Sequence, residues 1–423
     1  MTKNTITITT KIRLYPTLEQ ETLLKNTMIS YVQACNMISP WVKNNTTITQ
    51  KKINSALYHE VRETTGLNSQ MAQSAIKTVI GTYKTIHKTQ PLWSIEPVFK
   101  KHRAELLRGK NYTLKKNNHI SLSTNQGRVI VPYTHDPGLS LTTGKLGTAT
   151  LLHKHGKWML HIPVTLDIEE LDIHGVESVV GIDMGIRFIA TTYDSQGKTV
   201  FYPGGEVKNK RAHYKMLRSE LQSRGTRSAR KRLRSIGSRE NRWMTDVNHQ
   251  VSKALVGNTD RPTLFVMEDL TGVRSVTEKV RKKDRYTQVS WAFHQLRVMI
   301  EYKARLAGHG SVVVDPKNTS RSCPKCGYTD KKNRDSRKHL FTCLSCSYRS
   351  NDDRVGAMNV YGKGIQYRVH STGSSASSSG VLSTTPGCSD RTGSDTSLLK
   401  AEETGSRYTA GQGQTPTSVG GGS

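Results

Sequence analysis

Three acidic residues stand out by their surroundings. Asp183 lies in the apolar stretch VVGIDMG, Glu268 ends the apolar run TLFVME, and Asp353 follows SYRSND. Carboxylates brought together repel one another unless a cation lies between them, and hard oxygen ligands select Mg²⁺ or Mn²⁺. Two such ions, about 3.5 to 4 Å apart, clamp the phosphate of a phosphodiester bond. The three acids therefore predict metal-dependent phosphodiester hydrolysis, with each acid both catalytic and a metal ligand.

Neighbouring acids offer alternatives at two of these positions. Any one of these acids, taken alone, is more typical of a solvated strand end or a helix cap than of a metal site. The prediction therefore depends on the order of the acids and on the strands that flank them. Asp269 is the alternative to Glu268, and Asp352 is the alternative to Asp353.

Four of the six cysteines form two close pairs with the spacing C-x2-C-x16-C-x2-C. This spacing is typical of tetrahedral zinc sites, and four thiolates leave no open coordination position for water. We therefore expect a structural Zn²⁺ ion, with His339 as a substitute ligand that the spacing does not require. The predicted ligands are Cys323, Cys326, Cys343 and Cys346.

The segment from Lys208 to Arg242 is strongly basic, with 13 Lys or Arg against two Glu. Such a run repels itself unless it meets an anion, and phosphate contacts give salt-dependent binding with little sequence information. We expect it to bind nucleic acid. The predicted contact residues are Lys208, Lys210, Arg211, Lys215, Arg218, Arg224, Arg227, Arg230, Lys231, Arg232 and Arg234.

The composition of the whole chain agrees with a polyanionic partner. Its 423 residues hold 63 Lys or Arg and 33 Asp or Glu, a formal net charge of +30. No apolar run of about 18 residues and no signal-peptide core is present, and six cysteines are too few for a disulfide framework at this length. These features predict a soluble intracellular protein that acts on nucleic acid and not on a membrane.

Residues 177 to 362 supply the elements that must position the acids. VVGIDMGIRFIATTYDSQGKTVFY predicts three antiparallel strands with a turn at Ser195-Gln196-Gly197. The basic helical stretch follows, and then a buried strand PTLFVMEDL, an amphipathic helix SWAFHQLRVMIEYKARLAGHG and a strand SVVVD. This order of strands and helices is that of an RNase H-like fold within a mixed α/β, multidomain chain.

The N-terminal part has a different pattern. ITITTKIRLY alternates like a strand up to Pro16, and the segment from Thr17 to about Lys88 has helical spacing. Alternation returns from about Leu92 to Leu166 as two hairpins, HISLST with RVIVPY and TATLLHK with WMLHIPVTL. We expect the strands on both sides of the helices to form one small β-barrel with a helical bundle inserted into it.

The C-terminal segment is poor in apolar residues. Residues 371 to 423 hold 32 Ser, Thr or Gly in 53 positions. Such a composition cannot bury enough apolar surface to offset its ordering entropy, so we predict a disordered tail.

Several of these motifs together resemble a known family. GIDMGIRFIATTY, FVMEDLTGV, VVVDPKNTSRSCPKCG with CLSCSY, and NDDRVGAMNV are similar to the successive catalytic-core motifs of the TnpB (OrfB) transposon-encoded nucleases, relatives of compact type V CRISPR effectors. KIRLYPTLEQ resembles the N-terminal opening of that family, so the resemblance covers nearly the whole chain. Where the family reads D-x-N-A-A-x-N, this chain has Val355 and Gly356 at the third and fourth positions.

The resemblance implies a function and a domain layout. Asp183, Glu268 and Asp353 match the acids of the split RuvC site, and the four cysteines match the zinc ligands. The implied protein is a prokaryotic, cytoplasmic and nucleoid-associated RNA-guided DNA endonuclease. Its partners are a guide RNA from the transposon end and double-stranded target DNA beside a short adjacent motif. The implied domains are a wedge-like β-barrel (1–16 and 89–170), a helical recognition insertion (17–88), a split RuvC core (177–319 and 350–362), a zinc ribbon (320–349) and a disordered tail (363–423).

Two other functions fit part of the sequence. A protein-only nuclease or transposase on the same core shares the acids and metals but acts without RNA. A guide-dependent DNA-binding protein or RNA-binding regulator binds without cutting, and the presence of all three acids disfavours it. The oligomeric state stays open.

Overall fold

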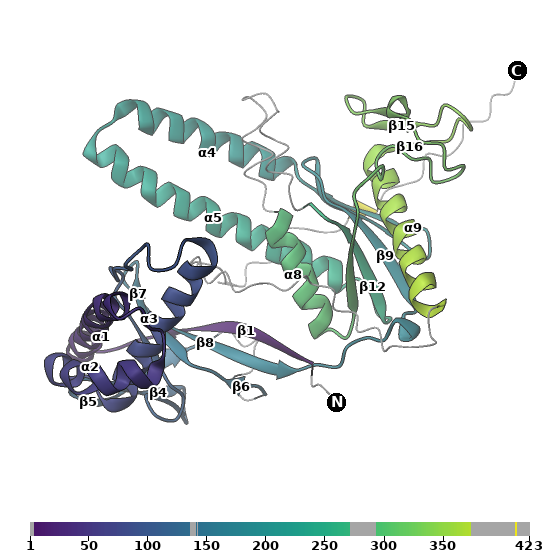
Figure 1. The fold of residues 1–423 in the computed structure, drawn as a ribbon. Coiled ribbons are helices and arrows are strands. Elements are labelled where there is room, and N and C mark those ends of the chain that lie inside the picture. The colour runs from purple at the N-terminus through teal and green to yellow at the C-terminus, as the bar shows by residue number, and fades with distance from the viewer. Residues whose placement is uncertain (1–3, 136–140, 142, 271–292, 374–410, 413–423) are drawn as a thin grey trace, which may run out of the picture. The chain divides into compact units, whose positions relative to one another are not determined.

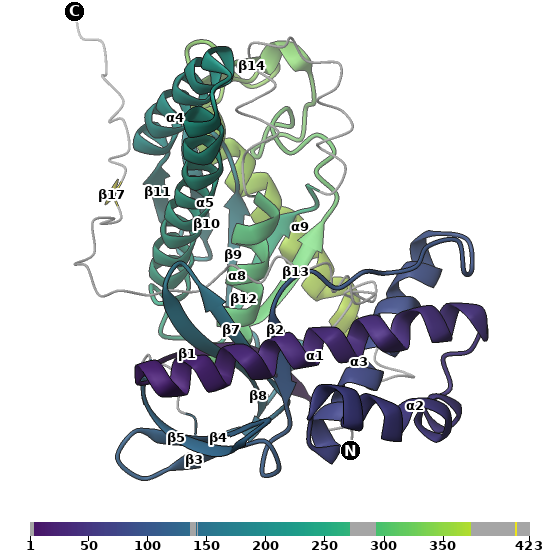
Figure 2. The same cartoon turned by 90° about the vertical axis from the view of Figure 1, so that its left-hand side faces the viewer.

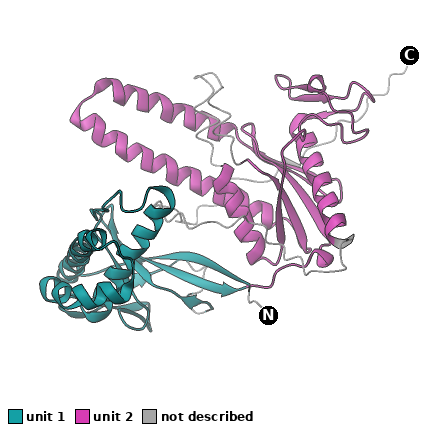
Figure 3. Ribbon diagram, in the orientation of Figure 1, with its two compact units in different colours: residues 1–167, 387–401 teal, residues 168–386, 402–423 magenta. Residues whose placement is uncertain are grey.

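The structure is a computed structural model that describes residues 4–135, 141, 143–270, 293–373 and 411–412. The described residues fall into two compact units, which meet in the sequence between Asp167 and Ile168 (Figure 3). Both units mix helices and strands, as predicted. No helix within the described ranges is long and apolar enough to cross a membrane.

An eight-stranded, nearly closed sheet forms the first unit, in the order β2-β7-β8-β1-β5-β4-β3 with β6 added to β8. A bridge between Arg108 and Tyr112 joins the two ends of this order. The N-terminal strand pairs with β8 from Thr5–Asp167 to Leu14–Trp158, so strands from both sides of the helical segment lie in one sheet. The strands are β1 (Thr5–Leu14), β2 (Arg103–Leu106), β3 (Tyr112–Lys115), β4 (His119–Thr124), β5 (Gly127–Thr134), β6 (Lys145–Leu146), β7 (Ala149–Lys154) and β8 (Lys157–Asp167).

Three helices lie between β1 and β2 in the sequence, as the helical spacing predicts. The first begins at a capping box, in which Thr17 and Gln20 satisfy each other's backbone amides. One continuous cluster of buried side chains, which includes Ile12 of the sheet and Leu24 of the first helix, joins the helices to the barrel-like sheet. The helices are α1 (Leu18–Asn44), α2 (Gln50–Thr65) and α3 (Ser69–Thr89) (Figure 1).

The second unit is built on a six-stranded sheet with the order β13-β12-β9-β10-β11-β17. The first three strands in the sequence form an antiparallel meander, whereas β12 runs parallel to β9 and β13 runs parallel to β12. The predicted succession of strands is therefore present. The strands are β9 (Ser178–Asp183), β10 (Phe188–Asp194), β11 (Thr199–Pro203), β12 (Thr263–Glu268), β13 (Gly310–Val314) and β17 (Gly411–Gln412).

Helices cover both faces of this sheet (Figure 1). Alternate residues of β12 point to the two faces. Phe265 and Met267 pack in the cluster with α5 (Arg227–Val256) and α8 (Phe293–Leu306). Leu264 and Val266 pack in the cluster with Val360 of α9 (Asp352–Gly373). A strand buried on both sides reads as a continuous apolar run, which explains the sequence TLFVME.

The basic segment forms a helical hairpin of α4 (Gly205–Arg224) and α5 (Arg227–Val256), which lie side by side in Figure 2. Gly225, with φ of 61°, ends α4, and the hydroxyl of Thr226 caps α5 by accepting from the amide of Ala229. Leu221 and Ile236 pack together inside the hairpin, so its basic side chains lie mostly on the outside.

A small three-stranded sheet follows β13 and carries the four cysteines on its loops. Its strands are β14 (Arg334–Asp335), β15 (Leu340–Thr342) and β16 (Arg349–Asn351), and they pair antiparallel. The last helix, α9 (Asp352–Gly373), starts directly after β16.

The predicted start of the disordered tail at residue 363 is wrong. Helix α9 continues to Gly373, because Ile365 and Tyr367 pack against the buried cluster between α9 and the sheet. Farther along, β17 pairs with β11 at the sheet edge, so disorder is also wrong for Gly411–Gln412. The remaining residues of the predicted tail, 374–410 and 413–423, lie outside the described residues.

Candidate active site

Two of the predicted acids lie at the ends of neighbouring strands. Strands β9 and β12 are parallel, and their register pairs Ile182 with Met267, so the next residues, Asp183 and Glu268, end at the same edge. Ile182 and Met267 pack toward α5 and α8. Because successive side chains of a strand point to opposite faces, Asp183 and Glu268 face α9.

The third acid comes from the first turn of α9, which packs closely on β9. A Cβ atom added at Gly181 would lie 2.3 Å from the amide nitrogen of Tyr361, so only glycine permits this approach. One turn earlier on α9, a Cβ atom added at Gly356 would lie 2.8 Å from Oδ2 of Asp183. The close packing brings Asp353, three residues before Gly356, to the same place as Asp183 and Glu268.

The charges of the other two carboxylates act on Asp183. Burial raises the pKa of Asp183 well above its usual range, and the charges of Glu268 and Asp353 raise it further. Burial also raises the pKa of Glu268 and of Asp353, which are only 7% and 8% exposed. Such a cluster holds either protons or a cation.

The donor set suits a divalent cation. Oδ2 of Asp353 is buried and has no hydrogen-bond partner, although a buried polar oxygen normally has one. Carboxylate oxygens are the ligands that Mg²⁺ and Mn²⁺ prefer. The residues present therefore fit the metal that the sequence predicts.

One alternative acid is engaged elsewhere, and the other lies beside Asp353, where His339, Asp352 and Asp353 each offer a ligand atom within 4.8 Å of the others. Asp269 forms an ion pair of 3.2 Å with Arg297 of α8, on the face away from α9. Asp352 is buried, and its Oδ2 accepts a 2.9 Å hydrogen bond from Nε of Arg334 in the ribbon. The pairing of Asp269 favours Glu268, whereas Asp352 stays close to the site, because its charge raises the pKa of both Asp353 and Asp183.

The sequence analysis missed Arg334 as a residue of this site. The charge of Arg334 lowers the pKa of Asp183, Glu268 and Asp353 against the larger opposing effect of burial, so it is a cation common to all three. The sequence could not distinguish Arg334 from the other Lys and Arg residues of the ribbon. Its role becomes visible only from its ion pair with Asp352 in the folded protein.

Two polar residues fix the start of α9. The side-chain oxygen of Asn351 accepts from the amides of Asp353 and Arg354 at 3.0 and 3.1 Å, as a helix cap does. The side-chain amide of Asn359 donates to the carbonyls of Thr319 and Ser322, at 2.6 and 2.8 Å. The backbone around Asp353 is thereby held to the ribbon on both sides.

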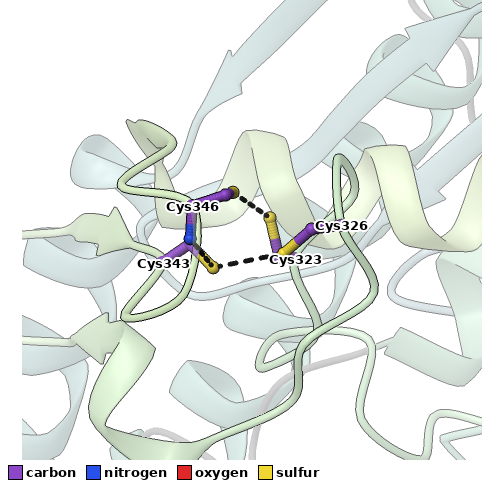
Figure 4. A group of neighbouring side chains, drawn as sticks. All are labelled: Cys323, Cys326, Cys343 and Cys346. Atoms are coloured by element: carbon purple, nitrogen blue, oxygen red, sulfur yellow. Dashed lines mark hydrogen bonds between the residues drawn. The ribbon is translucent and has the colours of Figure 1, made fainter.

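The four predicted zinc ligands converge (Figure 4). Their sulfur atoms lie within 4.8 Å of one another, with Cys323 to Cys346 at 3.6 Å and Cys326 to Cys343 at 3.5 Å, and the cysteines form no disulfide. Sulfur atoms that bind one tetrahedral zinc at about 2.3 Å lie about 3.8 Å apart. The cluster therefore fits Zn²⁺. His339 lies instead beside Asp352, at 3.7 Å.

Val355, which departs from the family motif, packs in the small core of the ribbon with Cys323, Phe341 and Cys343. It follows Asp353 by two residues on α9. The fold of the ribbon and the position of Asp353 are therefore coupled through one buried cluster.

The structure separates the predicted nucleic-acid contacts into two groups. Arg211 is buried against Glu240 at 3.9 Å, Arg218 also pairs with Glu240, and Lys210 lies over the ring of Trp243 at 4.5 Å. These three hold the hairpin together. The exposed group is Lys208, Lys215, Arg224, Arg227, Arg230, Lys231, Arg232 and Arg234.

Two family models match this chain. Residues 161–271 match OrfB_IS605, described as "Probable transposase", and residues 293–360 match the model described as "Cas12f1-like, TNB domain". Together they cover β8 to the end of β12, and α8 to the middle of α9. The predicted resemblance to the TnpB (OrfB) family is confirmed.

Relatives named as TnpB-like proteins or as Cas12f support the same resemblance. The chain is 29% identical over 195 residues to a TnpB-like protein of Methanocaldococcus jannaschii (44% of this chain, 69% of the relative). It is 25% identical over 316 residues to the "Putative RNA-guided DNA endonuclease InsQ" of Escherichia coli K12 (70% and 74%). It is 25% identical over 239 residues to the CRISPR-associated endodeoxyribonuclease Cas12f1 of Syntrophomonas palmitatica (53% and 46%), so the chain spans about half the length of that relative. A solved structure of CasPhi-2 (Cas12j) bound to crRNA is similar with a TM-score of 0.46 at 10% identity (87% of this chain, 98% of that chain).

Proposed function

We propose that this protein is a metal-dependent, RNA-guided DNA endonuclease with a single RuvC-type site. The observation that carries the proposal is the meeting of Asp183, Glu268 and Asp353, which come from β9, β12 and α9. These three elements lie far apart in the sequence. Three carboxylates, of which two are buried and one is half-buried, rarely lie together without a cation to hold.

The strand order of the second unit supports a RuvC assignment. An antiparallel meander followed by two parallel strands, with helices on both faces, is the arrangement expected of an RNase H-like core. We assign this core to residues 177–319 and α9, the zinc ribbon to residues 320–349, and the wedge-like barrel with its helical insertion to residues 1–170.

The three acids would hold the catalytic cations. Two Mg²⁺ or Mn²⁺ ions held there would supply activation of the attacking water and stabilisation of the leaving 3′ oxygen. The protein orients one of the ligands through the start of α9, where Asn351 holds the backbone of Asp353. Arg334 offsets part of the negative charge, so the carboxylates would give up their protons to a metal more readily than they would without it.

The four-cysteine cluster has a structural role in this proposal. It would hold one Zn²⁺ in a closed site, and the binding energy of the metal contributes to the folding of the ribbon. Because Val355 packs in that ribbon, the zinc also stabilises the position of Asp353.

The charge and the relatives support RNA guidance. A net charge of +30 and eight exposed cations on the α4–α5 hairpin favour binding to nucleic-acid backbones. InsQ, which aligns over most of its length, carries an RNA-guided name. Sequence recognition then falls to base pairing by a bound RNA, and the protein contacts the backbone of the heteroduplex.

Programmed cleavage tests this proposal. The protein is expressed with its flanking transposon-end sequence, the copurifying RNA is sequenced, and the guide segment of that RNA is replaced. We expect plasmid cleavage in Mg²⁺ to move to the matching site, and Asp183→Ala to abolish it while RNA still binds. Cleavage that persists after complete RNA removal would identify a protein-only nuclease, and programmed binding without cleavage by the wild type would identify a regulator.

A further inference from the structure

A second group of ligand-bearing side chains lies where the ribbon meets α9. His339, Asp352 and Asp353 each offer one ligand atom, and these atoms lie within 4.8 Å of one another. The two acids are buried, and His339 is half-buried. This group shares Asp353 with the three-acid site, whereas an imidazole and a further carboxylate are its own.

The pairing of β15 with β16 brings these residues together. The antiparallel register places Leu340 opposite Asn351, so the next residues along the two chains, His339 and Asp352, also face each other. The amide of Asp352 donates to the carbonyl oxygen of His339 at 3.3 Å. Because α9 begins at Asp352, Asp353 follows in the first turn of that helix. The ribbon thus presents an imidazole to the two acids that begin α9.

Two atoms of this group have unsatisfied bonding capacity. Nδ1 of His339 and Oδ2 of Asp353 are both buried, and neither has a hydrogen-bond partner. Buried polar atoms normally have a partner, so two orphan atoms in one group indicate a ligand there. Cations in the three-acid site would account for the oxygen of Asp353, but they offer nothing to the nitrogen of His339. An ion bound by all three residues satisfies both atoms.

The backbone of His339 gives no reason for a histidine at this position. Its φ of 53° lies in the left-handed region, which glycine adopts without steric cost and asparagine adopts readily. Either residue would therefore make the turn between β14 and β15 at least as well. The imidazole itself needs an explanation from its surroundings.

An ion pair between a protonated His339 and Asp352 is the simplest alternative. Nδ1 of His339 lies 3.7 Å from Oδ1 of Asp352, whereas hydrogen-bonded nitrogen and oxygen atoms lie about 2.9 Å apart. Two ligands held by one tetrahedral ion at about 2.1 Å lie about 3.4 Å apart. The observed distance is closer to the separation of two metal ligands.

Asp352 has an oxygen available for such an ion. Its Oδ2 accepts from Arg334, and its Oδ1 accepts one hydrogen bond, from the amide of Asp353 at 3.0 Å. A carboxylate oxygen has a second lone pair, so Oδ1 can also bind a cation. The charge of Arg334 offsets only one of the two adjacent carboxylates, which leaves negative charge for a cation to neutralise.

The mixed donor set determines which ions fit. Mg²⁺ prefers oxygen ligands and gives up its water reluctantly, so an imidazole nitrogen disfavours it. Divalent ions of the first transition series accept nitrogen and carboxylate oxygen together. Only three protein ligands are present and Arg334 lies beside them, so we expect such an ion to be held more loosely than zinc in the four-cysteine cluster.

We infer that His339, Asp352 and Asp353 bind a divalent transition-metal ion, in preference to Mg²⁺, at the junction of the ribbon and α9. An ion there fixes the orientation of the carboxylate that the group shares with the three-acid site. Only this connection to cleavage rests on the proposed function. The binding of the ion does not, and it can be measured without any substrate.

Mn²⁺ is the probe for this site, because its unpaired electrons report a directly bound nitrogen nucleus through electron spin echo modulation. The full-length protein with its ribbon zinc is dialysed to remove loosely held ions, and substoichiometric Mn²⁺ is added in a large excess of Mg²⁺. The same measurement on Asp183→Asn weakens the competing three-acid site. We expect a nitrogen coupling in both proteins.

Two histidine variants identify the source of the nitrogen. His339→Asn suits the left-handed backbone but lacks the imidazole, so it should fold, lose the coupling and bind Mn²⁺ about ten-fold or more weakly. Its affinity for Mg²⁺ should stay unchanged. The matched control is His174→Gln, which alters an exposed histidine of η1 (Ile173–Gly175) and should keep the coupling.

Three results would overturn the inference: no nitrogen coupling in the wild type, a coupling that survives in His339→Asn, or equal loss of Mn²⁺ and Mg²⁺ affinity in that variant. If the wild type still cuts programmed targets, these results leave the proposed function intact. Conversely, a nitrogen-bound Mn²⁺ in a protein that shows no programmed cleavage would support the metal site and contradict the proposed function.

Discussion

Gly356 on α9 faces the carboxylate of Asp183 on β9 so closely that a methyl group added at residue 356 would meet Oδ2 at 2.8 Å. The family motif has alanine at this position, whereas this chain has glycine, which puts no Cβ atom into the contact. The packing of α9 and the position of Asp183 are therefore fitted to each other.

We expect Gly356→Ala to lower the rate of DNA cleavage by about ten- to a hundred-fold, because a displacement of about 1 Å at a reacting group has an effect of that size. The matched control is Gly362→Ala on the same helix, where the added Cβ meets nothing within 4 Å. The control should keep full activity and gain about 0.5 to 1 kcal/mol in helix stability. Equal cleavage by the two variants would show that Asp183 can shift at no cost.

Asp183→Asn should stabilise the metal-free protein at neutral pH, although it abolishes cleavage. The folded state raises the pKa of Asp183, so the ionised carboxylate lowers the free energy of unfolding as pH rises above the ordinary aspartate range. Each kcal/mol relieved should raise Tm by about 2 to 4 °C. Thermal scans without metal check this at pH 4 and pH 8: the gain should appear only at pH 8. Mg²⁺ should stabilise the wild type more than the variant, and an equal effect on both would contradict a metal role for Asp183.

Arg334→Gln should raise the Mg²⁺ concentration needed for half-maximal cleavage and move the pH profile to higher pH. Without Arg334, the pKa of each of the three carboxylates rises further, so protons compete better with the metal. Arg334→Lys should retain part of the effect, and Lys338→Gln, an exposed change in the same ribbon, should retain wild-type behaviour. An unchanged Mg²⁺ requirement would limit Arg334 to its pairing with Asp352.

Purified protein should contain one zinc ion per chain, measurable by elemental analysis. Cys343→Ser should remove the zinc, unfold the ribbon and reduce cleavage, because Val355 and Asp352 both contact the ribbon near Asp353. Cys35→Ala in the first unit should leave the zinc content unchanged. A zinc-free wild type with an ordered ribbon would refute a metal role for the cysteines.

Arg211→Met and Arg232→Gln should separate stability from binding in the basic hairpin. Arg211 is buried with Glu240, and breaking such a pair costs about 3 kcal/mol, so the first variant should unfold more easily. Arg232 is exposed, so the second should keep its Tm and lose nucleic-acid affinity with a smaller salt slope. Urea unfolding and salt titrations measure the two effects, and a stable Arg211→Met variant with weakened binding would reverse the assignment.

The sequence predicted those features that a short segment encodes by itself. The alternation of β1 and β8, the apolar run of β12 and the cysteine spacing each identify their element, because local period and ligand spacing determine them. Features that depend on distant partners were missed. The sequence alone predicts Arg211 as a phosphate contact, whereas in the fold it is buried and pairs with Glu240, 29 residues later. In the same way, only the ion pair with Asp352 indicates a role for Arg334.

The end of α9 shows the same limit. Composition alone placed the tail too early, because the apolar residues Ile365 and Tyr367 are few and their packing partners lie on the sheet and near η1 (Ile173–Gly175). The sequence of α9 by itself therefore does not indicate that these residues are buried in a core shared with the sheet.

Asp183 and Asp353 meet in the folded protein, although their positions differ by 170 residues. A ribosome adds about 5 to 20 residues each second, so roughly 10 to 30 s pass between the synthesis of the two. During that interval β9 and β12 can pair, but the growing chain has no third carboxylate and no α9. If the chain is the nuclease proposed above, it is harmless to the DNA and RNA around its own site of translation until α9 has been made. The order of the segments along the gene thus delays the assembly of the three-acid site until late in the synthesis of this segment of the chain.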